Sequence, residues 1–356
     1  MYVKINKSKI NELIKGAFVD MKKILVSFLI ISMLLAMTVS SYAATKKITI
    51  SVSDPVTSYI YAAAEEFARR ATEYSDGTLE FKIVADGVLF DGDTSNGIVL
   101  LGSGKLEILI LSSLVYAPFV SGFSVISVPY MFDSHEQLLE YLHSDIAEEL
   151  FNRVNSIGIT VVGKWTRSFR EITNSKHPIY SPDDLNGIIL RVPNNPLFVE
   201  FFTECGAITT PMDFSKLYQA LKDESIDGQE NPVDVPFSGK FYEAQKYISF
   251  TNHMSDAWLV GINTRFFKHL TKKQQSALER AGNEVQKWNV EMMAEKDKLA
   301  LQTLLDNGMQ ANEISKDAQS EFVKVSKSCY ERFRGLIRDD ELFEKTAAFT
   351  GKSFTE

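Results

Sequence analysis

The sequence predicts a two-domain α/β protein in which each domain is a mostly parallel sheet flanked by helices. Two stretches, residues 46–111 and 187–232, each alternate short apolar strands with helical segments. That order favours parallel strands joined by helical crossovers. The chain has 356 residues, which is long for a single hydrophobic core and suits two domains.

The first stretch begins with an alternating strand at residues 46–53, whose apolar residues fall on one face. A helix follows Thr57 or Ser58, either of which can cap its first turn. The rest of this βαβαβ order is a second strand, a short helix and an apolar strand, at residues 79–83, 95–102 and 106–111. We expect an open sheet covered by helices.

The second stretch carries polar residues at the carboxyl ends of its predicted strands. Arg191 is the only charge in an apolar run that Pro193 stops, and Asn231 ends the last strand of the stretch. In parallel α/β sheets, ligands bind outside these strand ends. An arginine there presents a fork of donors that matches a carboxylate, and an asparagine offers donors and an acceptor.

The chain then crosses back to the first domain and enters a long helix. Strands are predicted at residues 159–165, 247–251 and 258–262. Thr271 caps a helix that runs to about Asp306, and an amphipathic helix follows at residues 316–337.

Residues 1–44 read as an upstream extension followed by a signal peptide. Met21 begins a basic segment, residues 24–39 are apolar, and Ala43-Ala44 supplies small residues for cleavage. A membrane anchor is the alternative, but Ser and Thr break the short apolar run. We therefore expect export to the periplasm.

Cleavage makes the protein strongly acidic. The first 44 residues hold six Lys and two acidic residues, so the formal net charge falls from −8 to −12. Such a surface does not attract nucleic acid or anionic membranes, and recognition of an anion must be local.

Six short motifs resemble one known family. They are Arg191-Val192-Pro193, Pro211-Met212-x-Phe214-Ser215, the run 227–232 (Asp-Gly-Gln-Glu-Asn-Pro), Arg170-x-x-Thr173-Asn174, Pro129-Tyr130-x-Phe132 and Thr251-Asn252-His253. In this order and spacing they are similar to the substrate-binding proteins of tripartite ATP-independent periplasmic (TRAP) transporters, which include dicarboxylate and sialic-acid binders. The resemblance runs from about Ile48 to the C-terminus.

The resemblance implies the periplasmic binding protein fold, with the long helix spanning both domains. It places residues 45–167 and 257–296 in domain I, and residues 168–256 and 297–356 in domain II. A cleft between them would close over one organic anion, which membrane permease subunits then receive. The ligand classes that fit are C4-dicarboxylates and sugar acids such as uronates, aldonates and sialic acid. We expect a monomer without a cofactor.

The resemblance also assigns site residues. Arg191 would hold the ligand carboxylate in a bidentate pair, with Arg170 beside it and Asn231 as a further contact. Arg167 competes with Arg170 for its role. Three aromatic residues are candidates for the cleft walls, Trp165, Phe169 and Trp258.

Each of these residues has a structural alternative. Arg191 can pair with a core carboxylate, since buried arginines need a partner. Asn231 can cap a turn before Pro232, and aromatic residues at strand ends are commonly core residues. Cys205 and Cys329 can pair in the periplasm or remain separate buried thiols.

Other functions leave weaker signals. The five histidines lack metal-ligand spacing. The resemblance implies binding without a metal, because family members that bind 2-oxo acids through a metal ion differ in the segment that corresponds to residues 229–232. Asp91 and Asp93 are read as a solvated turn, because a calcium loop would end in a Glu that is missing here. A periplasmic lyase, with His253 and Asp256 as an acid–base pair, is one rival function. A binding protein that serves a signalling receptor is the other.

Overall fold

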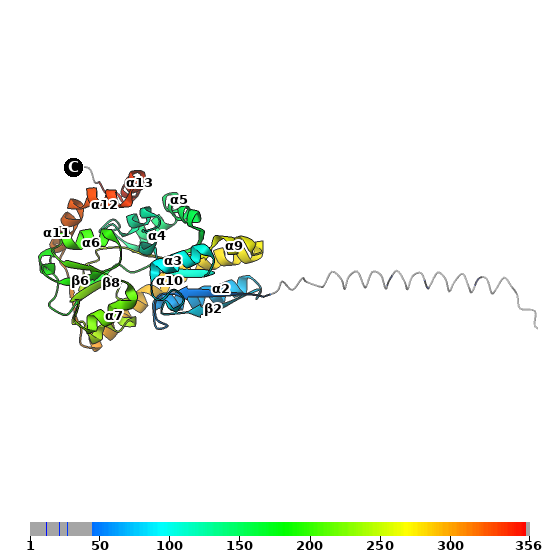
Figure 1. Ribbon diagram of the computed structural model, residues 1–356, viewed down its shortest axis with the longest axis horizontal. Coiled ribbons are helices and arrows are strands. Elements are labelled where there is room, and N and C mark those ends of the chain that lie inside the picture. The colour runs from blue at the N-terminus through cyan, green and yellow to red at the C-terminus, as the bar shows by residue number, and fades with distance from the viewer. Residues whose placement is uncertain (1–11, 13–20, 22–26, 28–44, 354–356) are drawn as a thin grey trace, which may run out of the picture. The chain divides into compact units, whose positions relative to one another are not determined.

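The computed structural model describes residues 45–353, and before them only residues 12, 21 and 27. The predicted extension and signal peptide therefore lie almost entirely outside the described residues. Between residues 46 and 353 the chain forms two sheets, sheet A and sheet B, flanked by helices (Figure 1).

Sheet A has the strand order β2-β1-β3-β10-β4. Its strands are β1 (Lys46–Val52), β2 (Leu79–Val84), β3 (Ile108–Ser112), β4 (Ile159–Thr166) and β10 (Ala257–Asn263). The strand β1 pairs in parallel with β2 and β3, as the first α/β stretch predicts. The strand β10 lies antiparallel between β3 and β4.

Sheet B has the strand order β11-β9-β5-β8-β6-β7. Its strands are β5 (Glu171–Asn174), β6 (Ile189–Val192), β7 (Ile208–Pro211), β8 (Gly228–Asn231), β9 (Tyr247–Phe250) and β11 (Gln310–Glu313). The strand β6 is parallel to β7 and β8, as predicted, whereas β5 is antiparallel to β8 and β9. The predicted α/β class is confirmed with one refinement. Both sheets are mixed, because each also takes strands from segments that cross between them.

Helices surround the two sheets, and several of them begin at capping residues that the sequence predicts. The α-helices are α2 (Tyr59–Tyr74), α3 (Thr94–Ser103), α4 (His135–Leu142), α5 (Asp145–Asn152), α6 (Pro196–Glu204), α7 (Phe214–Lys222), α8 (Asp234–Ser238), α9 (Thr264–His269), α10 (Lys272–Asp306), α11 (Lys316–Ser328), α12 (Tyr330–Ile337) and α13 (Asp340–Thr350). Short 3₁₀ helices lie at Val88–Phe90 (η1), Ser113–Tyr116 (η2), Ser121–Ser127 (η3), Arg153–Ile157 (η4), Pro182–Leu185 (η5) and Phe241–Glu243 (η6). Of the two caps predicted for α2, Ser58 makes the bond, accepting from the Tyr61 amide.

The long helix α10 begins and ends where the sequence predicts and packs on both sheets. Thr271 caps it by accepting from the Gln274 amide. Its first half joins the core of sheet A through Leu278, Ala281 and Val285. Its second half packs Ala300 and Leu304 against Ile248 of sheet B. One rigid element thus supports both sheets.

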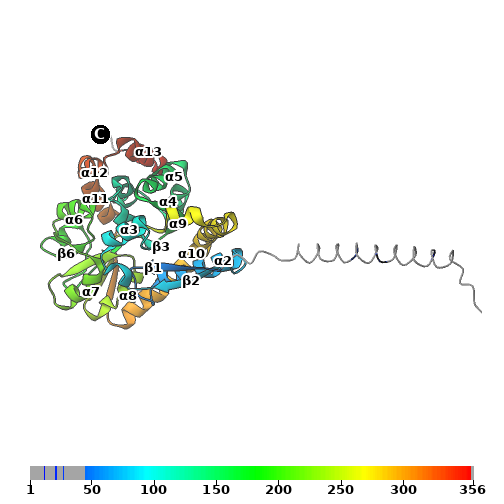
Figure 2. The same ribbon diagram turned by 45° about the vertical axis from the view of Figure 1, so that its right-hand side comes forward.

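The C-terminal helices contact helices that pack on sheet A, α4 and α5, and a helix that packs on sheet B, α6. Figure 2 shows α11, α12 and α13 beside α4, α5 and α6. The helix α12 packs on η3 and on α6, and α13 packs on α4 and α5. The division into domains I and II stays a prediction. Within the described residues, no helix combines the length and hydrophobicity needed to cross a bilayer.

Candidate functional site

A polar cavity lies where the carboxyl ends of strands from both sheets meet. From sheet A it is lined by residues that follow β1, β3 and β4, together with Trp258 at the start of β10. From sheet B it is lined by Arg170, Arg191, Asn231 and the residues after β7. The empty space is about 680 Å³, part of it open to solvent, which is in the usual range for small-molecule sites.

Strand register brings the predicted polar residues of sheet B together. Arg191 on β6 lies opposite Gln229 on β8, two residues before Asn231. Asn231 in turn lies opposite Glu171, the first residue of β5. Because β5 runs antiparallel to β8, its beginning lies beside the end of β8. Arg170, which precedes β5, therefore reaches the same edge as Asn231 and Arg191.

Arg191 is a buried cation without a carboxylate partner. Its side chain is 3% exposed, and its Nε and Nη2 both donate to the carbonyl oxygen of Met212, at 3.0 and 2.6 Å. Within residues 45–353, no carboxylate lies at ion-pair distance from its guanidinium, and Nη1 has no hydrogen-bond partner. Burial lowers the pKa of Arg191 to about 10. A buried charge in this state is costly unless an anion accompanies it.

Arg170 differs from Arg191 because its donors are already used. Nε and Nη2 bind the two carboxylate oxygens of Glu230, with 2.8 Å from Nη2 to Oε1. Nη2 also donates to the Glu230 carbonyl at 2.9 Å and to Asn231 Oδ1 at 3.0 Å. Burial works against the charge of Arg170, but the charge and hydrogen bonds of Glu230, with the charges of Asp256 and Asp234, together outweigh it and raise the pKa of Arg170. Only Nη1 is left, and it lies 3.6 Å from Asp256 Oδ2.

Arg167 also lines the cavity, at the end of β4. Its Nη1 binds Asp256 Oδ2 at 2.8 Å, and its guanidinium lies 3.9 Å from the ring centroid of Trp258. Asp256 additionally accepts hydrogen bonds from the hydroxyls of Ser112 and Ser113. Both Arg167 and Arg170 thus have internal carboxylate partners, which leaves Arg191 as the unpaired arginine of the three.

Two of the predicted wall residues do not line the cavity. Trp165 is fully buried, packs against Phe67 and donates its indole N–H to the Gly282 carbonyl at 2.8 Å. Phe169 stacks on His135, with ring centroids 4.7 Å apart. A buried indole needs an acceptor for its N–H, and the backbone of α10 supplies it on the core side. Of the three predicted aromatic residues, Trp258 does reach the cavity.

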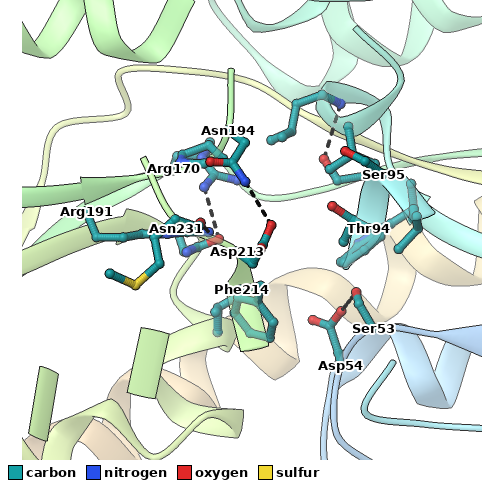
Figure 3. A pocket seen from close by; sticks show the side chains of 18 of the residues that line it. Ser53, Asp54, Thr94, Ser95, Arg170, Arg191, Asn194, Asp213, Phe214 and Asn231 are labelled. Carbon is teal, nitrogen blue, oxygen red and sulfur yellow. Dashed lines mark hydrogen bonds between the residues drawn. The ribbon is translucent and has the colours of Figure 1, made fainter. Parts of the chain in front are cut away.

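The wall opposite the arginines consists of residues that the sequence did not single out as ligand contacts. Figure 3 shows Ser53, Asp54, Thr94 and Ser95 across the cavity from Arg170, Arg191 and Asn231. Ser53 and Asp54 directly follow β1, and Thr94 and Ser95 begin α3. The signal that could have found Ser53 and Asp54 is the one that found Arg191, a polar residue at the carboxyl end of a predicted strand.

The structure also bears on the remaining alternatives from the sequence, namely a calcium loop, an acid–base pair and a disulfide. Asp93 caps α3 by accepting from the Asn96 amide, and no group of residues suited to a metal ion occurs within the described part of the chain. His253 hydrogen-bonds to Thr251 and Glu230, at 2.7 and 3.2 Å, so it does not form the acid–base pair with Asp256. Cys205 and Cys329 are separate buried thiols.

Two sheets that present their carboxyl ends to a shared polar cavity define a solute-binding protein of the periplasmic type. Comparison with known proteins agrees. The model of one family, described as bacterial extracellular solute-binding protein, family 7, matches residues 50–335, and the chain belongs to this family. Members of the family are solute-binding proteins, and the resemblance to TRAP transporter binding proteins is confirmed.

Individual relatives are similar over most of their length. The 2,3-diketo-L-gulonate-binding periplasmic protein YiaO of Escherichia coli is 28% identical, over 70% of this chain and 76% of its own. The C4-dicarboxylate-binding periplasmic protein DctP of Rhodobacter capsulatus is 27% identical, over 69% and 73%. The crystal structure of the sugar acid binding protein DctPAm from Advenella mimigardefordensis, in complex with galactonate, matches with a TM-score of 0.82. It is 26% identical and covers 86% of this chain and 98% of that one.

Proposed function

We propose that this protein captures an organic acid anion, a sugar acid or a C4-dicarboxylate, and delivers it to the membrane subunits of a TRAP transporter. The observation that carries the proposal is Arg191, a buried guanidinium in the cavity with no counter-ion among the described residues. A ligand carboxylate supplies the missing negative charge. The named ligands of the relatives, 2,3-diketo-L-gulonate, C4-dicarboxylates and galactonate, support the same class.

In the proposed complex, the ligand carboxylate binds Arg191 through Nη1 and a second donor, because a guanidinium fork suits two parallel bonds. Asn231 presents one remaining amide hydrogen, since Nδ2 also donates to Gln229 Oε1 at 2.6 Å. Arg170 fixes the orientation of Asn231 and contributes Nη1. Trp258, held against Arg167, forms the wall of sheet A. Closing the cleft excludes water and strengthens these charged contacts.

The same proposal covers the processing of the protein, its location and its oligomeric state. Residues 1–20 are an upstream extension, and the signal peptide begins at Met21. The mature chain begins at Ala44 or Thr45 and works in the periplasm as a monomer. It binds no nucleic acid and catalyses no reaction. Intact-mass measurement of protein recovered from the periplasm tests the processing. A chain that retains residues 21–39 would contradict it.

A thermal-shift screen of organic acids, followed by calorimetry, tests the binding function. A ligand at one hundred times its Kd adds about 2.7 kcal/mol to the free energy of unfolding, so a specific acid produces a clear rise in Tm. The neutral amide of the same acid is the control and should give no shift. If no carboxylate raises Tm, the proposed function is wrong. Consumption of a bound acid by the purified protein would favour the lyase instead.

A further inference from the structure

The cavity offers a single uncompensated positive charge. Arg167 is paired with Asp256 at 2.8 Å, and Arg170 is paired with Glu230 at 2.8 Å. Arg191 donates only to a neutral backbone carbonyl. A ligand with one carboxylate would therefore balance the charge of the arginine wall. A second carboxylate on the ligand would find no free guanidinium among the residues that line the cavity.

The wall opposite the arginines carries one buried carboxyl group, Asp54, and is rich in hydroxyls. Asp54 is 4% exposed, and one of its carboxylate oxygens accepts from the Ser53 hydroxyl at 2.5 Å. Within residues 45–353, its other oxygen has no hydrogen-bond partner, and no cation lies at ion-pair distance. Thr94 and Ser95 add hydroxyls beside it. These groups suit ligand hydroxyls, which both donate and accept hydrogen bonds.

Two neighbouring features could reduce the preference of this wall for ligand hydroxyls over a carboxylate, and neither does. The N-terminus of α3 would attract an anion, but Asp93 already caps it by accepting from the Asn96 amide at 3.0 Å. Asp213 is a second carboxylate at the cavity, and it accepts from Asn194 Nδ2 at 2.8 Å with Lys216 3.6 Å away. Among the described residues, Asp54 has no cation or amide in contact with it. Burial raises its pKa, while the Ser53 hydroxyl and the more distant charge of Arg167 act to lower it.

We propose that the cavity selects a polyhydroxylated acid with a single carboxylate, such as an aldonate or a uronate, and that Asp54 is the residue that disfavours a second carboxylate. This inference rests on the proposed function and narrows it from organic acids in general to sugar acids with one charge. Asp54 acts by accepting a hydrogen bond from a ligand hydroxyl and by repelling a carboxylate placed there. Specificity of this kind comes from a repulsive element as well as from attraction.

Pairs of acids that differ at one end only give the direct test. D-galactonate and D-gluconate each end in a hydroxymethyl group, and D-galactarate and D-glucarate carry a carboxylate in its place. Hexanoate has the same chain length without hydroxyls. In calorimetry at pH 7.5, we expect the preferred aldonate to bind the wild-type protein at least one hundredfold more tightly than its diacid and than hexanoate.

Two substitutions isolate the charge of Asp54. Asp54→Asn should reduce the preference for the aldonate over its diacid at least tenfold. Asp317→Asn is the control, because Asp317 is exposed and lies outside the cavity lining, and its substitution removes the same charge. Asp317→Asn should leave the preference unchanged.

The outcomes separate the inference from the function on which it rests. If wild type binds the diacid or hexanoate as tightly as the aldonate, the inference is wrong and the binding function stands. The same holds if the strongest acid in the thermal-shift screen carries two carboxylates or no hydroxyl. If Asp54→Asn and Asp317→Asn show the same preference for the aldonate over its diacid, Asp54 is not the selecting residue. If no organic acid binds at all, both the function and the inference fail.

Discussion

Arg170 and Glu230 form a buried two-point ion pair at the edge of sheet B, with Nη2 2.8 Å from Oε1 and Nε bound to Oε2. Burial alone would raise the pKa of Glu230, but the charge and hydrogen bonds of Arg170 outweigh burial and lower it. The side chains of Arg170 and Glu230 are 2% and 0% exposed. Arg170 is therefore held by a carboxylate within the protein, whereas Arg191 lines the cavity and donates only to the Met212 carbonyl.

Arg170→Ala is expected to destabilise the protein by roughly 3–5 kcal/mol, because it leaves Glu230 as a buried, unpaired charge. Urea unfolding monitored by circular dichroism measures the change. The double variant Arg170→Met/Glu230→Leu is the control and should recover most of the loss, since neither charge remains. An Arg170→Ala protein as stable as wild type would show that the ion pair contributes little to the stability of the fold.

Arg191→Met is expected to behave in the opposite way. It should leave the ligand-free protein as stable as wild type or more stable, because it removes a buried charge that lacks a counter-ion. It should weaken binding of the preferred acid at least one hundredfold in calorimetry. Arg191→Lys should also bind weakly, since an ammonium cannot reproduce the two parallel bonds of a guanidinium. Wild-type affinity in Arg191→Lys would make the role of Arg191 structural.

Asp234 makes the stability of the ligand-free protein depend on pH. Burial raises its pKa from 3.8 to about 7, although Arg167 acts to lower it. Two further carboxylates, Asp297 and Asp54, raise it, and Lys296 and Arg170 are the other cations whose charges couple to it. The folded state thus prefers the protonated acid, so stability is greatest below pH 4 for this group and is lost as pH rises towards 7.

Asp234→Asn should remove that dependence and stabilise the protein at pH 8, by up to about 4 kcal/mol if the whole rise in the pKa of Asp234 is expressed. Urea unfolding at pH 5, 6, 7 and 8 compares the slopes. The control is Asp317→Asn, at an exposed position, and it should keep the wild-type slope. Parallel pH profiles for wild type and Asp234→Asn would contradict the assignment.

Gly92 allows a close approach between the loop before α3 and the helix α7. Its φ is +70°, and a Cβ at this position would lie 2.6 Å from the Cβ of Ser215. The Ser215 hydroxyl donates to the Gly92 carbonyl at 3.2 Å. Because this contact joins the two sides of the cavity, Gly92→Ala should oppose closure and weaken ligand binding at least tenfold.

Gly77→Ala is a matched control for backbone strain, because Gly77 has a φ of +74° and a Cβ added there would meet no atom of a non-neighbouring residue within 4 Å. Gly77→Ala should lower the free energy of unfolding but leave the affinity for the ligand unchanged. Adding Ser215→Gly to Gly92→Ala should restore binding, since it removes the atom that clashes. Equal affinities for Gly92→Ala and Gly77→Ala would show that this contact plays no part in closure.

Local sequence patterns were enough to predict the elements and one side of the site. Alternation in residues 46–53 and the Thr271 cap depend on neighbouring residues, and the structure places β1 and α10 where they were expected. Arg191 and Asn231 were found because a polar residue at the end of an apolar strand is visible in the chain itself. The family motifs gave the same residues their expected roles, which stay predictions.

The tertiary structure decided which charges are paired. Glu230 lies 60 residues after Arg170, and only the antiparallel register of β5 and β8 brings them together. Asp54 and Arg191 come from different sheets, so no local pattern could set them on opposite walls. Trp165 lies in the core, where its indole N–H donates to the Gly282 carbonyl of a helix more than one hundred residues further along the chain. Elements follow from short-range propensity, but charge balance follows from contacts between segments that are distant in the sequence.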